Sequence, residues 1–270
     1  MQTFNYHTHT ARCNHAQVVP DHDFAQALYD AGFRHIAFTD HVPQPESFNP
    51  LPESRMKTEE TDAYLESINQ LKKEFEGRMI IEAGFEIEYD PQLESYYRAL
   101  RERCDLFILG QHYVIDDDGS YVVPRNRLFT DQELEKYVDL VEQAAASGLI
   151  RLIAHPDTFM LGRTSFGEAE AAAARRICEI SLRYDIPLEI NLCQPYWNRV
   201  KGKTIHYPVA GFWQIAAQYP VKVLWGVDMH YIEQAGMAKD VIEFTTNLLG
   251  KDTIDQLQFV DENLQPVSNS

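Results

Sequence analysis

Residues 1–15 read MQTFNYHTHTARCNH and bring three histidines to the start of the chain. Residues 3–6 form a short, apolar-leaning run that predicts a strand, and His7 and His9 follow it directly. Side chains two residues apart on a strand point to the same side, so both imidazoles can face one point in space. Imidazole nitrogen suits zinc, iron and manganese. Two surface histidines near a chain end are the alternative interpretation, because short motifs also arise by chance.

Composition limits the class of protein. The chain has 270 residues, 44% of them hydrophobic, and a formal net charge of −17. This length fits one α/β domain. The acidic balance argues against nucleic acid or an anionic membrane as a partner, but bound cations would still admit a small phosphorylated substrate. With four widely spaced cysteines and no signal-peptide or membrane-spanning pattern, we expect a cytoplasmic protein with reduced thiols.

A short apolar run followed by a helical pattern recurs along the chain. The predicted strands cover residues 3–6, 34–39, 79–85, 106–109, 150–154, 186–190 and 221–227. The predicted helices cover 20–32, 58–75, 91–103, 130–147, 168–184, 208–219 and 232–249, and Thr130 with Glu133 fits a capping box. This alternation predicts parallel βα units in a single α/β domain over residues 1–270. Seven such units would close into a distorted TIM-like (β/α)7 barrel, with a doubly wound open sheet as the alternative.

Imidazole and carboxylate side chains gather where the predicted strands end. Six of the seven predicted strands end in such residues, namely His7, His9, Asp40, His41, Glu86, His112, His155, Asp228 and His230. The carboxyl ends of parallel strands form the active-site edge of α/β folds, and in a closed barrel they converge on one mouth. The pattern therefore predicts a metal site at the C-terminal ends of the strands.

The ordered motifs YHTHT with the later CNH, FTDH, GFE, GQH, AHPD and GVDMH resemble those of the PHP (polymerase and histidinol phosphatase) metallophosphoesterases. This resemblance covers residues 4–230 and implies a (β/α)7 barrel with three divalent ions, of zinc, iron or manganese. It implies a first ion held by His7, His9, Glu86 and Asp228. It implies a second held by Glu86, His112 and His155, and a third held by His15, His41 and His230. Glu88 is the alternative to Glu86 as the bridging carboxylate.

The resemblance also implies a reaction. Two adjacent metal ions lower the pKa of water from about 15.7 towards neutrality, and the resulting hydroxide would attack phosphorus in line. Asp228 or Asp40 would carry the proton; Asp40 could instead orient a ligand, and a helix N-cap or loop carboxylate is its alternative interpretation. We therefore expect a metal-dependent phosphomonoester hydrolase. The substrate would be a small phosphorylated molecule, and the oligomeric state cannot be read from this sequence.

The nearest branch of the family is the histidinol phosphatases, on the grounds of total length, SRMKTEE and GFEIEYDP. L-Histidinol phosphate is therefore the best single substrate. The GQHY and VDMH motifs depart from that branch and leave open a nucleotide, sugar phosphate or phosphotyrosine substrate. A non-catalytic metal-binding regulatory protein is a further alternative. Candidate contacts to substrate are Arg163, which we also count as catalytic, and Arg125, Arg127, Asn191 and His206.

Overall fold

The computed structural model describes residues 2–267, and its centre is a curled parallel sheet. Strands β1 (Phe4–Asn5), β2 (His35–His41), β3 (Ile80–Ile87) and β4 (Leu106–Leu109) pair in that order. A second run consists of β7 (Leu188–Asn191), β8 (Lys222–Gly226) and β9 (Gln258–Phe259). All of these pairs are parallel, and single-residue bridges join Ile153 to both Leu109 and Leu188. A further parallel bridge links Thr8 to Met229.

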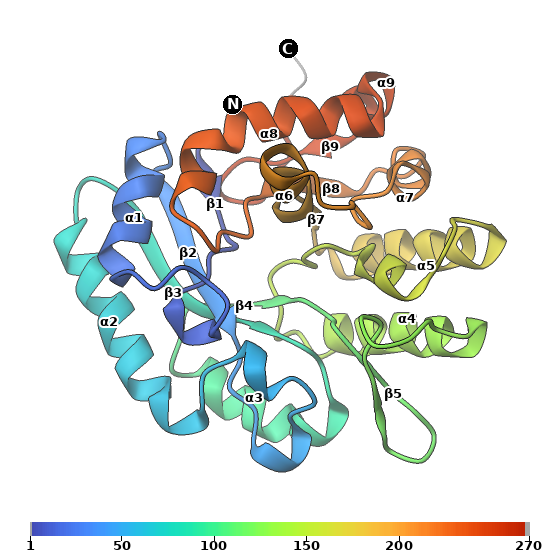
Figure 1. The fold of residues 1–270 in the computed structure, drawn as a ribbon, viewed down its shortest axis with the longest axis horizontal. Helices are drawn as coiled ribbons and strands as arrows, with labels where there is room; N and C mark the ends of the chain where they lie inside the picture. The colour runs from blue at the N-terminus through green and yellow to red at the C-terminus, as the bar shows by residue number, and fades with distance from the viewer. Residues whose placement is uncertain (1, 268–270) are drawn as a thin grey trace.

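Helices lie around the outside of the strands, with α1 and α2 on one side and α4 and α5 on another (Figure 1). Their bounds are α1 Asp21–Asp30, α2 Thr61–Glu74, α3 Glu94–Arg101, α4 Asp131–Ala146, α5 Glu168–Tyr184, α6 Cys193–Lys201, α7 Ala210–Ala216, α8 Glu233–Leu249 and α9 Lys251–Gln256. A short antiparallel hairpin is formed by β5 (Val114–Ile115) and β6 (Tyr121–Val122). Short 3-10 helices cover Ala11–Cys13, Glu46–Phe48, Pro52–Ser54, Thr58–Glu60, Pro91–Leu93 and Thr158–Gly162.

All seven predicted helices are present, each within a few residues of its expected bounds. The capping box at α4 is confirmed, because the Thr130 backbone N–H donates to Glu133 Oε2 at 2.7 Å and Glu133 N–H donates to Thr130 Oγ1 at 3.2 Å. A regular strand at 150–154 is not found. Backbone hydrogen bonds run from this segment towards β4 and β7, but only Ile153 forms bridges, and His155 leaves the extended conformation with φ 30°.

Helix α6 was not predicted. It follows β7 after a single residue and carries Pro195 at its third position. Proline there reads as a helix breaker in sequence, but it is tolerated in a first turn because the N–H groups of that turn have no partner within the helix. The elements β5, β6, α9 and β9 were also missed, and three of these are two-residue strands too short to show a periodic pattern.

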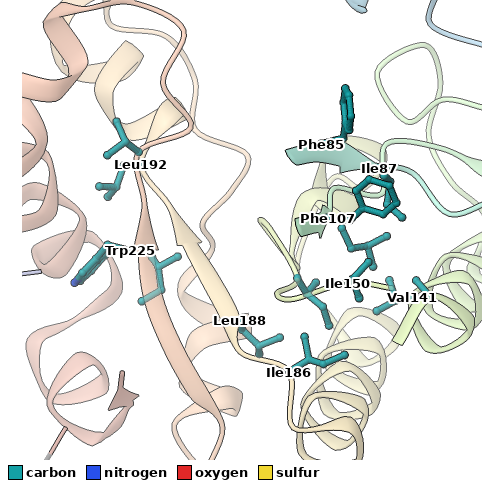
Figure 2. Close-up of a cluster of buried hydrophobic side chains, with 14 of the residues drawn as sticks. Phe85, Ile87, Phe107, Val141, Ile150, Ile186, Leu188, Leu192 and Trp225 are labelled. Carbon is teal, nitrogen blue, oxygen red and sulfur yellow. The ribbon is translucent and has the colours of Figure 1, made fainter. Parts of the chain in front are cut away.

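Strand alternation divides the core into two parts. Phe107 and Leu109 of β4 belong to the larger cluster, between the sheet and the surrounding helices, whereas Leu106 and Ile108 belong to a smaller cluster on the other face. Figure 2 shows the larger cluster, with Trp225 on β8 and other labelled apolar side chains on the sheet and α4. The smaller cluster fills the inner face of the curled sheet. At the carboxyl ends of the strands, buried histidines and carboxylates take the place of these apolar side chains.

Candidate metal centre

The carboxyl ends of β2 and β3 bring the first two predicted ligands side by side. His41 is the last residue of β2 and is in register with Glu86 on β3. Alternation along β3 sends Phe85 and Ile87 into the apolar layer under the helices, so Glu86 points to the opposite face of the sheet. The Glu86 carboxylate is fully buried there.

Glu86 lies at the centre of a ring of imidazoles. Its Oε1 is 2.8 Å from His155 Nε2, and its Oε2 is 2.9 Å from His41 Nδ1. The Nε2 atoms of His7 and His112 are each 3.6 Å from Oε1. One carboxylate therefore contacts histidines from four separate segments of the chain.

Asp228 forms a second centre beside the first. Its Oδ1 is 3.2 Å from His9 Nε2, 3.5 Å from His7 Nε2 and 3.2 Å from His230 Nδ1. His230 Nε2 lies 2.8 Å from His15 Nε2. Potential ligand atoms of His9 also lie within 4.8 Å of those of His41 and His230. The structure thus brings together all nine predicted ligands, with His9 between two of the expected ion positions.

Hydrogen bonds to the outer nitrogens orient several of these rings. The Nδ1 atom of His112 is 2.9 Å from Glu88 Oε1, and that of His15 is 2.7 Å from the Cys13 carbonyl oxygen. A carboxylate or carbonyl accepts but does not donate, so each Nδ1 carries the proton and each Nε2 presents a lone pair to the cluster. Lone pairs on neighbouring rings then face each other, an arrangement that a cation between them stabilises.

Several buried polar atoms in this cluster have no hydrogen-bond partner. They are His9 Nδ1, His41 Nδ1, Glu86 Oε2, His155 Nδ1 and Asp228 Oδ1, whose close contacts within the cluster lack the geometry of a hydrogen bond. An unsatisfied buried polar atom costs about 1–3 kcal/mol, and more when it is charged. Among residues 2–267, Arg55 is the only lysine or arginine that is buried, although five carboxylates are buried near the histidines: Asp40, Glu86, Glu88, Glu189 and Asp228. The donor set therefore fits divalent cations.

Electrostatics inside the cluster support the same conclusion. Burial by itself would raise the pKa of Glu86, but His41, His112 and His7 hold that pKa well below its usual range. Burial lowers the pKa of His7, yet Glu189 and Asp228 outweigh it and raise the pKa well above its ordinary value. A proton on His7 thus supplies positive charge that a metal ion would provide instead, and metal binding would release that proton.

The backbone at two candidate ligands is strained. His155 has φ 30° and Asp228 has φ 48°, in the left-handed region that residues other than glycine rarely adopt. Such conformations cost of order 1–3 kcal/mol and cluster at functional sites. Glycine also makes room for the carboxylates, because a Cβ at Gly110 would lie 1.7 Å from Glu86 Oε1. The glycine of the GQH motif is therefore a requirement of packing against Glu86.

The cluster opens into a cavity of about 490 Å³. Arg125 and His206, both predicted substrate contacts, line this cavity together with Asp228. Asn191 lies deeper, where it is buried and its Nδ2 donates to Asp228 Oδ2 at 3.0 Å. Asp40 does not line the cavity. It is buried behind His9 and accepts hydrogen bonds from the Thr10 backbone and hydroxyl.

Two predicted phosphate contacts lie elsewhere. Arg163 forms ion pairs with Glu170 and Asp131, and its Nη1 donates to the Phe129 carbonyl at 2.8 Å. Arg127 forms an ion pair with Glu133. Neither arginine lines the cavity. The structure does not place either guanidinium group at the cavity, because carboxylates in the first turns of α4 and α5 hold both of them.

Sequence reasoning missed two buried residues of the site. Glu189 Oε2 lies 3.0 Å from His7 Nδ1, and Arg55 pairs through both terminal nitrogens with Glu88, at 2.9 and 3.0 Å. The sequence held a signal for each residue. Glu189 is a charged residue between Leu188 and Ile190 of an apolar strand, and Arg55 stands at the end of the proline-rich loop. Glu88, the alternative to Glu86 as bridging carboxylate, thus contacts Arg55 and the Nδ1 atom of His112.

A family model described as the PHP domain matches residues 5–192. The chain belongs to the PHP domain family. Its relatives include a "probable histidinol-phosphatase" of Deinococcus radiodurans, 27% identical over 237 residues that cover 85% of this chain and 87% of the relative. A histidinol-phosphatase of Bacillus subtilis is 35% identical over 129 residues, 45% of this chain and 48% of that protein.

A solved PHP-like fold resembles the whole chain. It is a histidinol phosphate phosphatase from Lactococcus lactis, complexed with zinc, L-histidinol and phosphate. The TM-score is 0.69 at 15% identity, and the match covers 99% of each chain. At this identity the likeness shows a common fold. Within residues 2–267, no helix of this PHP chain is long and apolar enough to cross a membrane, and all four cysteines are free.

Proposed function

We propose that this PHP protein is a metal-dependent phosphomonoester hydrolase with L-histidinol phosphate as its substrate. The observation that carries the proposal is the group of buried imidazole nitrogens that face one another around the Glu86 and Asp228 carboxylates. The names of the two curated relatives and of the Lactococcus structure favour this substrate over other phosphate esters.

The nine predicted ligands are assigned to three ions of zinc, iron or manganese. The first is held by His7, His9, Glu86 and Asp228, the second by Glu86, His112 and His155, and the third by His15, His41 and His230. When bound, such ions act as Lewis acids on a phosphoryl group and lower the pKa of water. Asp228 lines the cavity and is the better placed of the two predicted proton carriers. Asp40, behind His9, is assigned to orienting that ring.

The cavity rim suits a phosphorylated substrate in spite of the acidic chain. Arg125, Lys201 and Lys203 line the cavity, and none of the three has a carboxylate within ion-pair distance among the described residues. Uncompensated cations beside a cavity attract an anionic group and raise its local concentration. Arg125→Gln is therefore expected to raise KM for a phosphate ester at least about tenfold, since a charge-assisted hydrogen bond contributes roughly 1.5–3 kcal/mol. Arg163→Gln should leave KM within about twofold, because Arg163 lies outside the cavity.

The finer architecture is also part of this proposal. The bridges at Ile153 and between Thr8 and Met229 support a ring in which β1, β2, β3, β4, the 151–154 segment, β7 and β8 form a (β/α)7 barrel. The whole chain would then be one PHP domain, although residues 1 and 268–270 lie outside the described structure. A cytoplasmic location and the absence of nucleic-acid and membrane partners stay predictions.

A different phosphate ester is the second candidate. L-Histidinol carries an ammonium group, and the described carboxylates that line the cavity are Glu86, Glu88 and Asp228, all engaged with histidine or arginine. The rim instead carries cations, with Lys201 and Lys203 each within 4.7 Å of the Trp197 ring centre. This arrangement favours a substrate without an ammonium group, such as a nucleotide or sugar phosphate.

One assay panel separates the two candidates. The purified protein, loaded with manganese or zinc, is given histidinol phosphate, a nucleoside monophosphate, a sugar phosphate and a phosphotyrosine peptide, and phosphate release is followed. The proposal expects kcat/KM for histidinol phosphate to exceed the others by at least about 100-fold, equivalent to roughly 2.7 kcal/mol. Preference for another ester would replace the substrate assignment. If the metal-loaded protein hydrolyses none of these esters, the assignment as a phosphomonoester hydrolase is refuted and a metal-binding regulatory role is favoured.

A further inference from the structure

We propose that Glu189 is a positioning residue that fixes the tautomer and orientation of His7 and strengthens it as a metal ligand. The inference rests on the metal assignment of His7 proposed above. Glu189 is the second residue of β7 and belongs to none of the predicted ligand sets. Its place on the inner face follows from alternation, because Leu188 and Ile190 on either side of it pack into the larger apolar cluster.

The contact between the two side chains is direct and excludes water. His7 Nδ1 lies 3.1 Å from Glu189 Oε1 and 3.0 Å from Oε2, and both side chains are fully buried. The carboxylate can only accept, so Nδ1 holds a proton and Nε2 is the nitrogen left to bind a metal ion. That Nε2 atom faces the cluster, 3.1 Å from His9 Nε2. The Glu189 contact thus determines which nitrogen of His7 is available to a metal ion.

Glu189, like Glu86, contacts histidine but within the described structure lacks the arginine partner that two other histidine-contacting glutamates, Glu88 and the half-buried Glu82, possess. Glu88 has Arg55 and Glu82 has Arg151 as an ion-pair partner. Among residues 2–267, Glu189 has no lysine or arginine within ion-pair distance. Its negative charge is therefore not neutralised by an arginine or lysine and bears directly on the imidazole of His7, which makes Nε2 a stronger donor to a cation on the far side of the ring.

The neighbouring strand holds the carboxylate in place. Gly226 on β8 is in register with Asn191 on β7, and a Cβ at Gly226 would lie 2.0 Å from Glu189 Cδ. Asn191 Nδ2 donates to Glu189 Oε1 at 2.9 Å and to Asp228 Oδ2 at 3.0 Å. Residues 189 and 191 of one strand therefore support two ligands of the same proposed ion, His7 and Asp228.

Metal affinity, not turnover, is the decisive measurement. Glu189→Gln keeps an acceptor for His7 Nδ1 but removes the charge, and Glu189→Leu removes both. We expect one bound ion to be held about 10–100-fold more weakly in a chelator competition, the range found when partners of metal-bound histidines are changed. The effect should be larger for Leu than for Gln. The visible spectrum of the cobalt-loaded protein should change with it, because His7 would no longer coordinate in a fixed orientation.

The chain offers a matched control and an independent variant. Glu82→Gln changes a carboxylate that also pairs with a histidine, His35, at 2.8 Å, but at the other end of the sheet, and it should leave metal affinity within about twofold. Gly226→Ala displaces Glu189 without altering any donor, and should reproduce the loss if Glu189→Leu fails to fold. Folded Glu189→Gln and Gly226→Ala proteins with wild-type affinity and cobalt spectrum would overturn the inference. A wild type that binds metal but hydrolyses no phosphate ester would refute the proposed function alone.

Discussion

The two ends of the parallel strands balance buried charge differently. At the amino ends, Glu82 Oε2 accepts hydrogen bonds from His35 Nε2 at 2.8 Å and Arg151 Nη1 at 2.6 Å. At the carboxyl ends, Glu86 contacts histidines but has no lysine or arginine within ion-pair distance in the described part of the chain. A buried charge is costly unless it is paired. At the amino ends the chain itself neutralises the glutamate with an arginine. At the carboxyl ends, positive charge from bound cations would be needed to neutralise Glu86.

The largest effect on metal binding and activity should come from changing Glu86, the carboxylate at the centre of the histidine cluster. Glu86→Gln removes the charge that faces imidazoles from four segments. We expect loss of bound metal and a fall in phosphate release of at least about 1,000-fold, because bound ions supply several kcal/mol of transition-state stabilisation. Glu82→Gln is the matched control at the amino end and should retain activity within about twofold. Equal losses in both variants would mean that the two ends do not differ in function.

The carboxyl end also contains one pair that the chain neutralises by itself. Arg55 and Glu88 are both buried, so Arg55→Met leaves an unpaired carboxylate in the interior. The free energy of unfolding should fall by about 3–5 kcal/mol, measured by urea titration. The double variant Arg55→Met with Glu88→Leu should recover most of this loss. The exposed pair of Arg98 and Glu94 provides the comparison, since Arg98→Met should cost about 0–1 kcal/mol.

The smallest effect concerns acid stability at the amino end. Burial alone would raise the pKa of Glu82, but His35 and Arg151 outweigh it and lower the pKa from 4.5 to about 2. A lowered folded-state pKa stabilises the protein above the unfolded value and ceases to do so as pH falls through the folded one. The difference in unfolding free energy between wild type and Glu82→Gln, both metal-free, should therefore be constant above about pH 5 and shrink between pH 4.5 and 2. A difference that grows on acidification would contradict this account.

Local sequence patterns were sufficient to place most elements and the predicted ligands. Glu86 could be located because apolar residues on either side mark a strand whose alternate face is polar, a rule that needs only neighbours in sequence. Arg163 could not be placed in the same way. Its partners Asp131 and Glu170 come from the first turns of α4 and α5, and nothing in the local pattern indicates which carboxylate a guanidinium will reach.

The sequence by itself determined the order of strands and helices, and the positions of histidines and carboxylates at the strand ends. It did so because periodicity, caps and strand ends are properties of short segments. Tertiary structure alone decided which distant carboxylates orient His7 and His112. Glu189 reaches His7 across 182 positions of the chain, and Arg55 reaches Glu88 across 33. These pairs form because curling of the sheet brings distant strands together in a space without water, where every charge must find a partner.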